Sequence, residues 1–221
     1  MFHAAAKLGV QVEPHWIATP AIATGGAEQL AAFDGVWGAP GSPYASMEGM
    51  LRAIEYAREQ NLVYLGTCAG FQYALIEFTR NVLGIPSADS AENRPDGDNI
   101  VITPVWCATP ERTPAAPVLC GTGVARVVPD TLLERSCGSG DLRGEYFCSF
   151  ETNPKFVARW KQAGLRVAAV GADGEMRALE LPEKRFFVAT LFQPQLSSSH
   201  ERPHPIILAY LRACARDTLP F

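Results

Sequence analysis

The chain has 221 residues, of which 48% are hydrophobic and 19% charged, and its formal net charge is −4. This composition is ordinary for a folded globular protein and excludes an intrinsically disordered chain. The slightly acidic balance gives no reason to expect a nucleic acid partner, and no apolar run reaches the roughly 18 residues that a membrane-spanning helix needs.

The first part of the sequence predicts helices and strands in alternation. The predicted elements are a helix at 27–33, a strand at 34–41, a helix at 46–60, a buried strand at 62–68 and a further helix that ends before Gly84. The second helix is well defined, because Met47, Met50 and Ile54 recur at three- and four-residue steps. Ser46 precedes it and can cap its first turn.

The rest of the sequence continues this alternation after a proline-rich stretch. We predict irregular structure at 86–117, strands at 117–128 and 144–150, a helix at 153–164, strands at 165–172, 176–181 and 185–192, and a closing helix at 204–216. Strands that alternate with helices favour one layered α/β domain with a mostly parallel sheet.

The cysteines give no sign of a disulfide framework. The six of them are Cys68, Cys107, Cys120, Cys137, Cys148 and Cys214. No two have the spacing C-x-x-C, and the start of the chain lacks the basic leader and long apolar stretch of a secretory signal. We therefore expect a cytoplasmic protein with reduced thiols, without a metal and without a cofactor.

One stretch carries chemistry. In YLGTCAGFQYALIEF, an apolar strand ends at Gly66, Cys68 follows, and a helical pattern begins at once. A nucleophile on such a turn lies above the edge of a sheet, where the amide groups and the dipole of the helix lower a thiol pKa and stabilise an oxyanion. A cysteine with a purely structural role at the end of a strand is the alternative.

The longer context resembles a known family. The stretch from DGVWGAPGSPY through GTCAGFQYALIEFTRNVLG to ADSAE, together with FETNP and FVATLFQP, is similar to the glutaminase domain of CTP synthases, a class I glutamine amidotransferase. Within that family it resembles standalone relatives of the CTP synthase C-terminal region. The resemblance implies a three-layer, flavodoxin-like α/β fold with a mostly parallel central sheet. It implies a single domain over 1–221, with no synthetase domain and with the family's first strand apparently missing.

The resemblance also implies a set of site residues. They are Cys68 as the nucleophile, Gly41, Ser42 and Ala69 in the oxyanion hole, and Gln72 and Glu92 at the amino-acid end of a substrate glutamine. From the residues alone, Gln72 reads as an exposed helix position and Glu92 as a solvated loop charge.

Two further stretches depart from the family pattern. The family reads F-H-P-E where this chain has FQPQ, so Gln193 and Gln195 replace the base and the acid of the catalytic triad. An amide cannot accept a proton near neutral pH. Ser149, with Cys148 beside it, stands where the family has an arginine that binds the carboxylate of glutamine. Both changes argue against glutamine as the substrate.

No other histidine is an obvious base. His200 follows Gln193 by seven residues and reads better as a solvated loop residue. His204 begins the last helix, where capping or packing is the expected role. For His3 and His15, both far from the motif in the sequence, we also expect structural roles.

Three functions remain open from the sequence. The first is an enzyme in which Cys68 attacks an amide, ester or related carbonyl of a small molecule other than glutamine, either alone or with an ammonia-accepting or synthetase-like partner protein. The second is an inactive pseudo-amidotransferase that binds a metabolite or a partner protein. The third is a thiol redox protein that uses Cys68 and Cys148.

Overall fold

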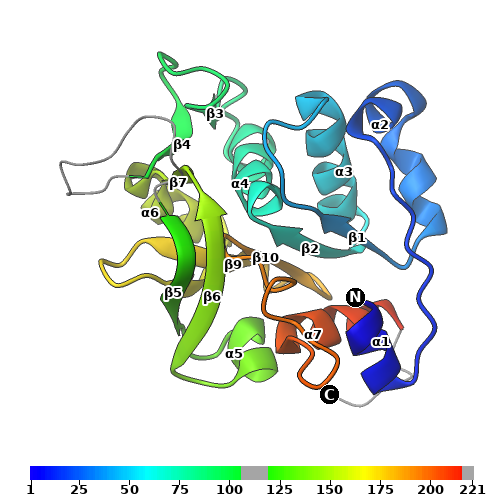
Figure 1. Cartoon of the computed structure of the whole chain (residues 1–221). Coiled ribbons are helices and arrows are strands. Elements are labelled where there is room, and N and C mark those ends of the chain that lie inside the picture. The colour runs from blue at the N-terminus through cyan, green and yellow to red at the C-terminus, as the bar shows by residue number, and fades with distance from the viewer. Residues whose placement is uncertain (106–118, 216–221) are drawn as a thin grey trace.

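The computed structural model describes residues 1–105 and 119–215, and its strands form two sheets (Figure 1). The large sheet contains, in spatial order, β1 (Gly35–Gly38), β2 (Val63–Thr67), β10 (Phe187–Thr190), β9 (Met176–Glu180), β8 (Arg166–Val170), β5 (Leu119–Val127) and β6 (Asp141–Cys148). The small sheet contains β3 (Asp89–Ser90), β4 (Ile100–Pro104) and β7 (Phe150–Thr152).

The α/β class is confirmed, but the central sheet is mixed rather than mostly parallel. Strands β1, β2 and β10 pair in parallel, whereas the pairs β10–β9, β9–β8, β8–β5 and β5–β6 are antiparallel. The reason lies in the connections. Only a few residues separate β8 from β9 and β9 from β10, and a parallel pair needs a crossover of a dozen residues or more.

Eight helices lie among the described residues. They are α1 (Phe2–Leu8), α2 (Thr19–Gly25), the 3₁₀ helix η1 (Ala27–Ala32), α3 (Met47–Glu59), α4 (Ala69–Asn81), α5 (Leu132–Cys137), α6 (Pro154–Gln162) and α7 (Pro205–Cys214). The predicted cap of α3 is confirmed, because Ser46 Oγ accepts a hydrogen bond from the Gly49 amide at 3.1 Å. None of the helices is long and apolar enough to cross a membrane, within the ranges described.

The helices form layers around β2. In Figure 1, α3 and α4 lie above β1 and β2, and α7 lies below them with α1 beside it. The buried surface of β2 explains its unbroken apolar sequence, since all five of its residues are buried. This arrangement holds the end of β2 and the start of α4 inside the molecule.

The segment predicted as irregular is partly ordered into the small sheet. β4 pairs with β3 in parallel and with β7 in antiparallel fashion, and β3 and β4 pack against α4. The prediction for 86–105 was therefore wrong for β3 and β4, where Val101 and Ile102 are fully buried. Residues 106–117 of that prediction lie outside the described residues.

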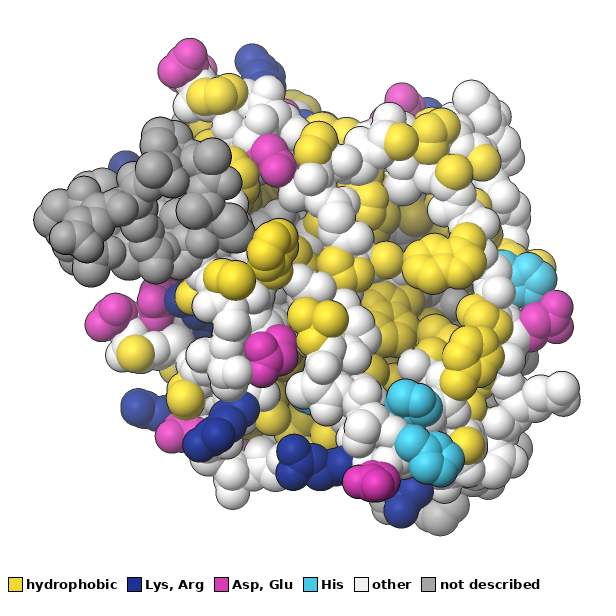
Figure 2. Space-filling view, in the orientation of Figure 1, with side chains coloured by type: hydrophobic (Ala, Val, Ile, Leu, Met, Phe, Trp, Pro, Cys, Tyr) yellow, Lys and Arg dark blue, Asp and Glu magenta, His cyan; other side chains and the backbone are white. Residues whose placement is uncertain are grey.

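One face of the surface shows a mixed character (Figure 2). Hydrophobic side chains surround a hollow between the layer of α3 and the layer of α7 and α1, while positive and negative side chains are interspersed around the margin of this face.

Candidate active site

Cys68 lies at the sharp turn between β2 and α4 that the sequence predicted. It is the N-cap of α4 and has φ 52° and ψ −105°, a backbone conformation that residues with a side chain rarely adopt. Its amide donates to the Thr190 carbonyl of β10 at 2.9 Å. The turn closes because Gly70 is small: a Cβ atom there would overlap the carbonyl oxygen of Gly38.

Main-chain donors surround the sulfur. The backbone amides of Ala69 and Gly41, two of the residues predicted for an oxyanion hole, hydrogen-bond to the sulfur of Cys68 and lower the pKa of its thiol. We call Gly41 together with the β2–α4 turn the elbow half of the site. Gly41 has φ 114°, so a residue with a side chain would be strained at this position.

A second thiol faces the first. Cys148, the last residue of β6, places its Sγ 3.4 Å from Cys68 Sγ, and both side chains are buried, at 3% and 8% exposure. The contact with the Cys148 thiol is the largest effect on the pKa of Cys68 and lowers it. The backbone amides of Ala69 and Gly41 lower this pKa further, while burial and the charge of Glu92 oppose the shift, and the net direction is downward. The same contact and burial raise the pKa of Cys148.

The residues expected at the substrate end contact other parts of the protein. Ser42 Oγ donates to Glu92 Oε1 at 3.1 Å, and Gln72 Nε2 donates to the Phe150 carbonyl at 3.1 Å. Gln72 is only 3% exposed, so the exposed helix position expected from the residues alone is wrong. Ser149 is exposed between β6 and β7.

Gln193 and Gln195 form a pair of their own. Gln195 Nε2 donates to Gln193 Oε1 at 3.1 Å. The backbone N–H of Gln193 donates to the backbone carbonyl of Glu145 at 2.7 Å. The Oε1 atom of Gln195 is buried and finds no hydrogen-bond partner among the described residues. We call residues 192–204, which connect β10 to α7, the return segment.

The four histidines make packing, ion-pair or capping contacts. His200 packs against His3 of α1, with ring centroids 6.0 Å apart, and His15 lies beside Glu13 and Phe33. His204 Nδ1 accepts from the Ile206 amide at 3.2 Å, so it caps α7 as predicted. No imidazole contacts Cys68 Sγ in the part of the chain that the structure describes.

Tyr44, near the sulfur, and Tyr73, which packs against it, were not expected at the site. Tyr44 and Tyr73 pack edge to face with centroids 4.8 Å apart, and Tyr44 donates to the Ala39 carbonyl. Burial, and then the proximity of Cys68, raises the pKa of Tyr44, so it stays a neutral wall of the site. The GSPY sequence after the Gly41 loop was the available signal, because it places an aromatic ring directly beside the oxyanion residues.

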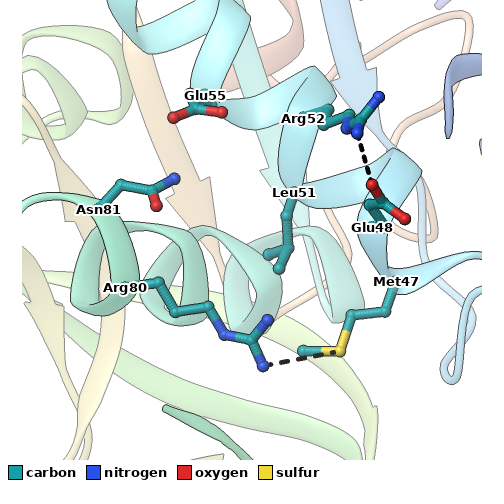
Figure 3. A pocket seen from close by; sticks show the side chains of 7 residues that line it. All are labelled: Met47, Glu48, Leu51, Arg52, Glu55, Arg80 and Asn81. Carbon is teal, nitrogen blue, oxygen red and sulfur yellow. Dashed lines mark hydrogen bonds and ion pairs between the residues drawn. The ribbon is translucent and has the colours of Figure 1, made fainter. Parts of the chain in front are cut away.

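A separate pocket lies on the outer side of α3 and α4 (Figure 3). It has a volume of about 390 Å³, and its lining is Met47, Glu48, Leu51, Arg52, Glu55, Arg80 and Asn81. Its charges are partly paired, since Arg52 and Glu48 form an ion pair at 2.5 Å. None of the site residues named above lines it. Among the described residues no group of three or more histidine, cysteine or acidic side chains is placed to hold a metal ion.

Comparison with known proteins agrees with this geometry. The family model for "Glutamine amidotransferase class-I" matches residues 1–105. Proteins named CTP synthase from Saccharolobus solfataricus and Methanopyrus kandleri are 33% and 32% identical over 97% of this chain, which spans 41% of their length. The solved glutaminase domain of Trypanosoma brucei CTPS, with bound acivicin, superposes with a TM-score of 0.90 at 24% identity, covering 99% of this chain and 86% of that domain.

The chain is therefore a member of the class I glutamine amidotransferases. More narrowly, it is a domain of the CTP synthase type, since it matches CTP synthases over nearly its whole length and shares the fold of their glutaminase domain.

Proposed function

We propose that the protein is a cysteine-dependent acyl-transfer enzyme that acts on a small carbonyl compound other than glutamine. The observation that carries this proposal is the placement of Cys68 Sγ against the amides of Ala69 and Gly41, on a strained strand-to-helix turn. Thiolate attack on a carbonyl carbon creates a negatively charged oxygen, and two amides already held by the fold stabilise that charge without reorganisation.

The site supplies a thiolate without a histidine. Hydrogen bonds from Cys148 and from two backbone amides lower the pKa of Cys68, so a larger fraction of it is ionised near neutral pH than in a free thiol. The attack therefore needs no separate general base.

The leaving group decides the substrate class. An amine leaves only when an acid protonates it, and neither Gln193 nor Gln195 can donate a proton as an acid at neutral pH. The pKa of Cys148 is raised, which makes this thiol a poor acid as well. A thiolate or an activated alkoxide leaves without a proton, so thioesters and activated esters suit this site better than amides.

Glutamine fits the site poorly at its other end. Ser149 carries no positive charge at the position where the family has its carboxylate-binding arginine, and Glu92 is engaged with Ser42. A free carboxylate would meet no charged partner there and would lie near the Glu92 carboxylate. The acyl compound should therefore be neutral at that end.

The test is acylation of purified protein by p-nitrophenyl acetate and by an acetyl thioester. We expect a burst of released leaving group and an acetyl adduct on Cys68, found by peptide mass spectrometry. Cys68→Ser should lose both. Cys120→Ser, which removes an exposed thiol outside the site, should retain both.

Two outcomes would contradict the proposal. One is acylation confined to exposed cysteines such as Cys120. The other is glutamine hydrolysis on the order of 1 per second or faster, the range of ordinary enzymes. An ammonia-accepting or synthetase-like partner belongs to glutamine chemistry; here the acceptor is proposed to be a small thiol or amine, in a reducing cytoplasm.

A second candidate is ligand binding without turnover. The buried, unpartnered Oε1 atom of Gln195 favours it, because such an acceptor is suited to a donor on a small metabolite. In that case no acyl adduct forms on Cys68. A neutral metabolite with an amide or hydroxyl donor would instead raise the melting temperature, and Gln195→Leu would abolish that rise.

A further inference from the structure

The sulfur atoms of Cys68 and Cys148 lie close enough for a disulfide bond to form between them after a small movement. The two residues are 80 positions apart in the sequence, yet their sulfur atoms lie 3.4 Å apart. A disulfide bond is about 2.05 Å long, so the sulfur atoms need to approach each other by only about 1.3 Å to form one. Small side-chain rotations provide a movement of this size, and the backbone of β6 and of the β2–α4 turn can stay in place.

The two thiols differ in the way that a nucleophile and its resolving thiol should differ. Cys68 accepts from the amides of Ala69 and Gly41 as well as from Cys148. Cys148 lies deeper, at 3% exposure against 8% for Cys68, with its Sγ 3.6 Å from the Leu191 carbonyl. A small oxidant therefore meets Cys68 first, and Cys148 remains protonated within reach of it.

We propose that Cys68 and Cys148 form a redox-active dithiol that reduces small hydroperoxides. The Cys68 thiolate attacks one oxygen of the hydroperoxide and breaks the O–O bond, which gives a sulfenic acid on Cys68 and releases an alkoxide or hydroxide. The Cys148 sulfur then attacks the Cys68 sulfur, the S–O bond breaks, and the Cys148 proton leaves with the hydroxyl group as water. The product is a Cys68–Cys148 disulfide.

A low-molecular-weight or protein dithiol closes the cycle. It reduces the disulfide by two successive exchanges, returns both cysteines to thiols and becomes a disulfide itself. None of these steps needs the missing histidine, because the attacking species is a thiolate and the leaving groups are hydroxide, alkoxide or water. The inference goes beyond acyl transfer and shares only the Cys68 sulfur with it.

The experiment treats fully reduced protein with one equivalent of hydrogen peroxide. We expect a loss of two hydrogen atoms by intact mass and a peptide pair that links Cys68 to Cys148. Cys148→Ser should instead accumulate a sulfenic acid on Cys68, trapped by dimedone. Cys137→Ser is the matched control, because burial raises the pKa of Cys137 to about 12 and it lies outside the pair; it should behave as the wild type.

The rates decide the outcome. Cys68 should be oxidised at least about tenfold faster than the exposed Cys120 in the same molecule, and the wild type should consume hydroperoxide catalytically with dithiothreitol as reductant. Equal oxidation of Cys68 and Cys120, or sulfenic acid on Cys68 in the wild type without a disulfide, would overturn the proposal. Acylation of Cys68 in Cys148→Ser separates this result from a failure of the acyl-transfer proposal.

Discussion

The elbow half and the return segment are held in place by different kinds of contact. In the elbow half, the Cys68 amide bonds to the Thr190 carbonyl, and Gly70 lies against the backbone of Gly38 with no room for a Cβ atom. These contacts are between main-chain atoms, so they leave the identity of most neighbouring side chains free. The position of Cys68 is therefore determined by backbone geometry.

The return segment depends on side chains instead. Gln195 donates to Gln193, Ser198 Oγ accepts from the His204 amide, and His204 Nδ1 caps α7. Replacing one such side chain changes the hydrogen bonds within the return segment and leaves the β2–α4 turn intact. The difference teaches that side chains of the return segment can be exchanged while the backbone geometry around Cys68 stays the same.

The largest expected effect comes from breaking the elbow half. Gly70→Ala should destabilise the fold by about 3 kcal/mol or more and abolish the distinctive reactivity of Cys68, because the added methyl group meets a backbone carbonyl that has little freedom to move. Urea denaturation and site-resolved alkylation measure the two effects. Gly84→Ala, where no atom lies within 4 Å of the new Cβ, should cost only about 1 kcal/mol from its positive φ.

We expect the return segment to be destabilised in acid through His204. Burial lowers the pKa of His204 to about 4, whereas an unfolded histidine titrates near 6.5, so the unfolded state binds the additional proton as the pH falls. The contribution of His204 to the free energy of unfolding should be constant above about pH 6.5 and fall by up to about 3 kcal/mol towards pH 4. His204→Asn keeps a capping oxygen and should flatten this part of the profile in urea titrations; an unchanged slope would exclude His204 as the cause.

The comparison can be sharpened by giving the return segment a base. Gln193→His with Gln195→Glu should raise the alkylation rate of Cys68 by iodoacetamide at pH 7 about tenfold, because an imidazolium stabilises a neighbouring thiolate. Glutamine turnover should remain poor until Ser149→Arg is added. Full glutaminase activity in the double variant alone would refute the claim that the substrate end has changed.

A smaller effect is expected at the second thiol. Cys148→Ala removes the donor that most lowers the pKa of Cys68, so that pKa should rise and alkylation at pH 7 should slow severalfold. Cys148→Ser keeps a hydroxyl donor and should retain most of the rate. A pH titration of Cys68 alkylation, followed by peptide mass spectrometry, compares the two. Identical profiles for the alanine and serine variants would mean that the thiol contact does not stabilise the thiolate.

The smallest effect concerns the carboxylate near the site. Glu92 raises the pKa of Cys68 through its negative charge, so Glu92→Gln should lower that pKa and speed alkylation at pH 7 by about twofold. The gain should shrink in high salt, which screens charges at this distance. Ser42→Ala, which removes the Glu92 hydrogen bond but keeps its charge, is the matched control.

Much of the fold could be predicted from the sequence because its elements follow short-range patterns. The period of Met47, Met50 and Ile54 defined α3, and the glycine and cysteine after an apolar run defined the β2–α4 turn. The pattern of residues did not predict the directions of β8, β9 and β5, because a period-two pattern is the same for parallel and antiparallel strands. The short connections between β8, β9 and β10 were the available signal.

The site could be predicted only in its elbow half. Gln72 is buried where the small sheet packs on α4, and two of the three strands of that sheet, β3 and β4, come from a segment that was expected to be irregular. That Cys148 points inward follows from its alternation with buried Tyr146 and exposed Phe147. That it meets Cys68 depends on where β6 lies in space, which no local pattern contains.

The strands next to the two thiols differ in how many neighbouring strands they are hydrogen-bonded to. β2 is hydrogen-bonded to a neighbour on each side, while β6 is the last strand of the large sheet as described, and Cys148 is at its end, opposite Leu119. Fraying begins at such ends. The backbone amides at the end of β6 should therefore exchange with solvent much faster than those of β2. Moderate warming should separate the sulfur atoms of Cys68 and Cys148 while the β2–α4 turn remains folded. Cys68 would keep its position at the β2–α4 turn after Cys148 has moved away from it.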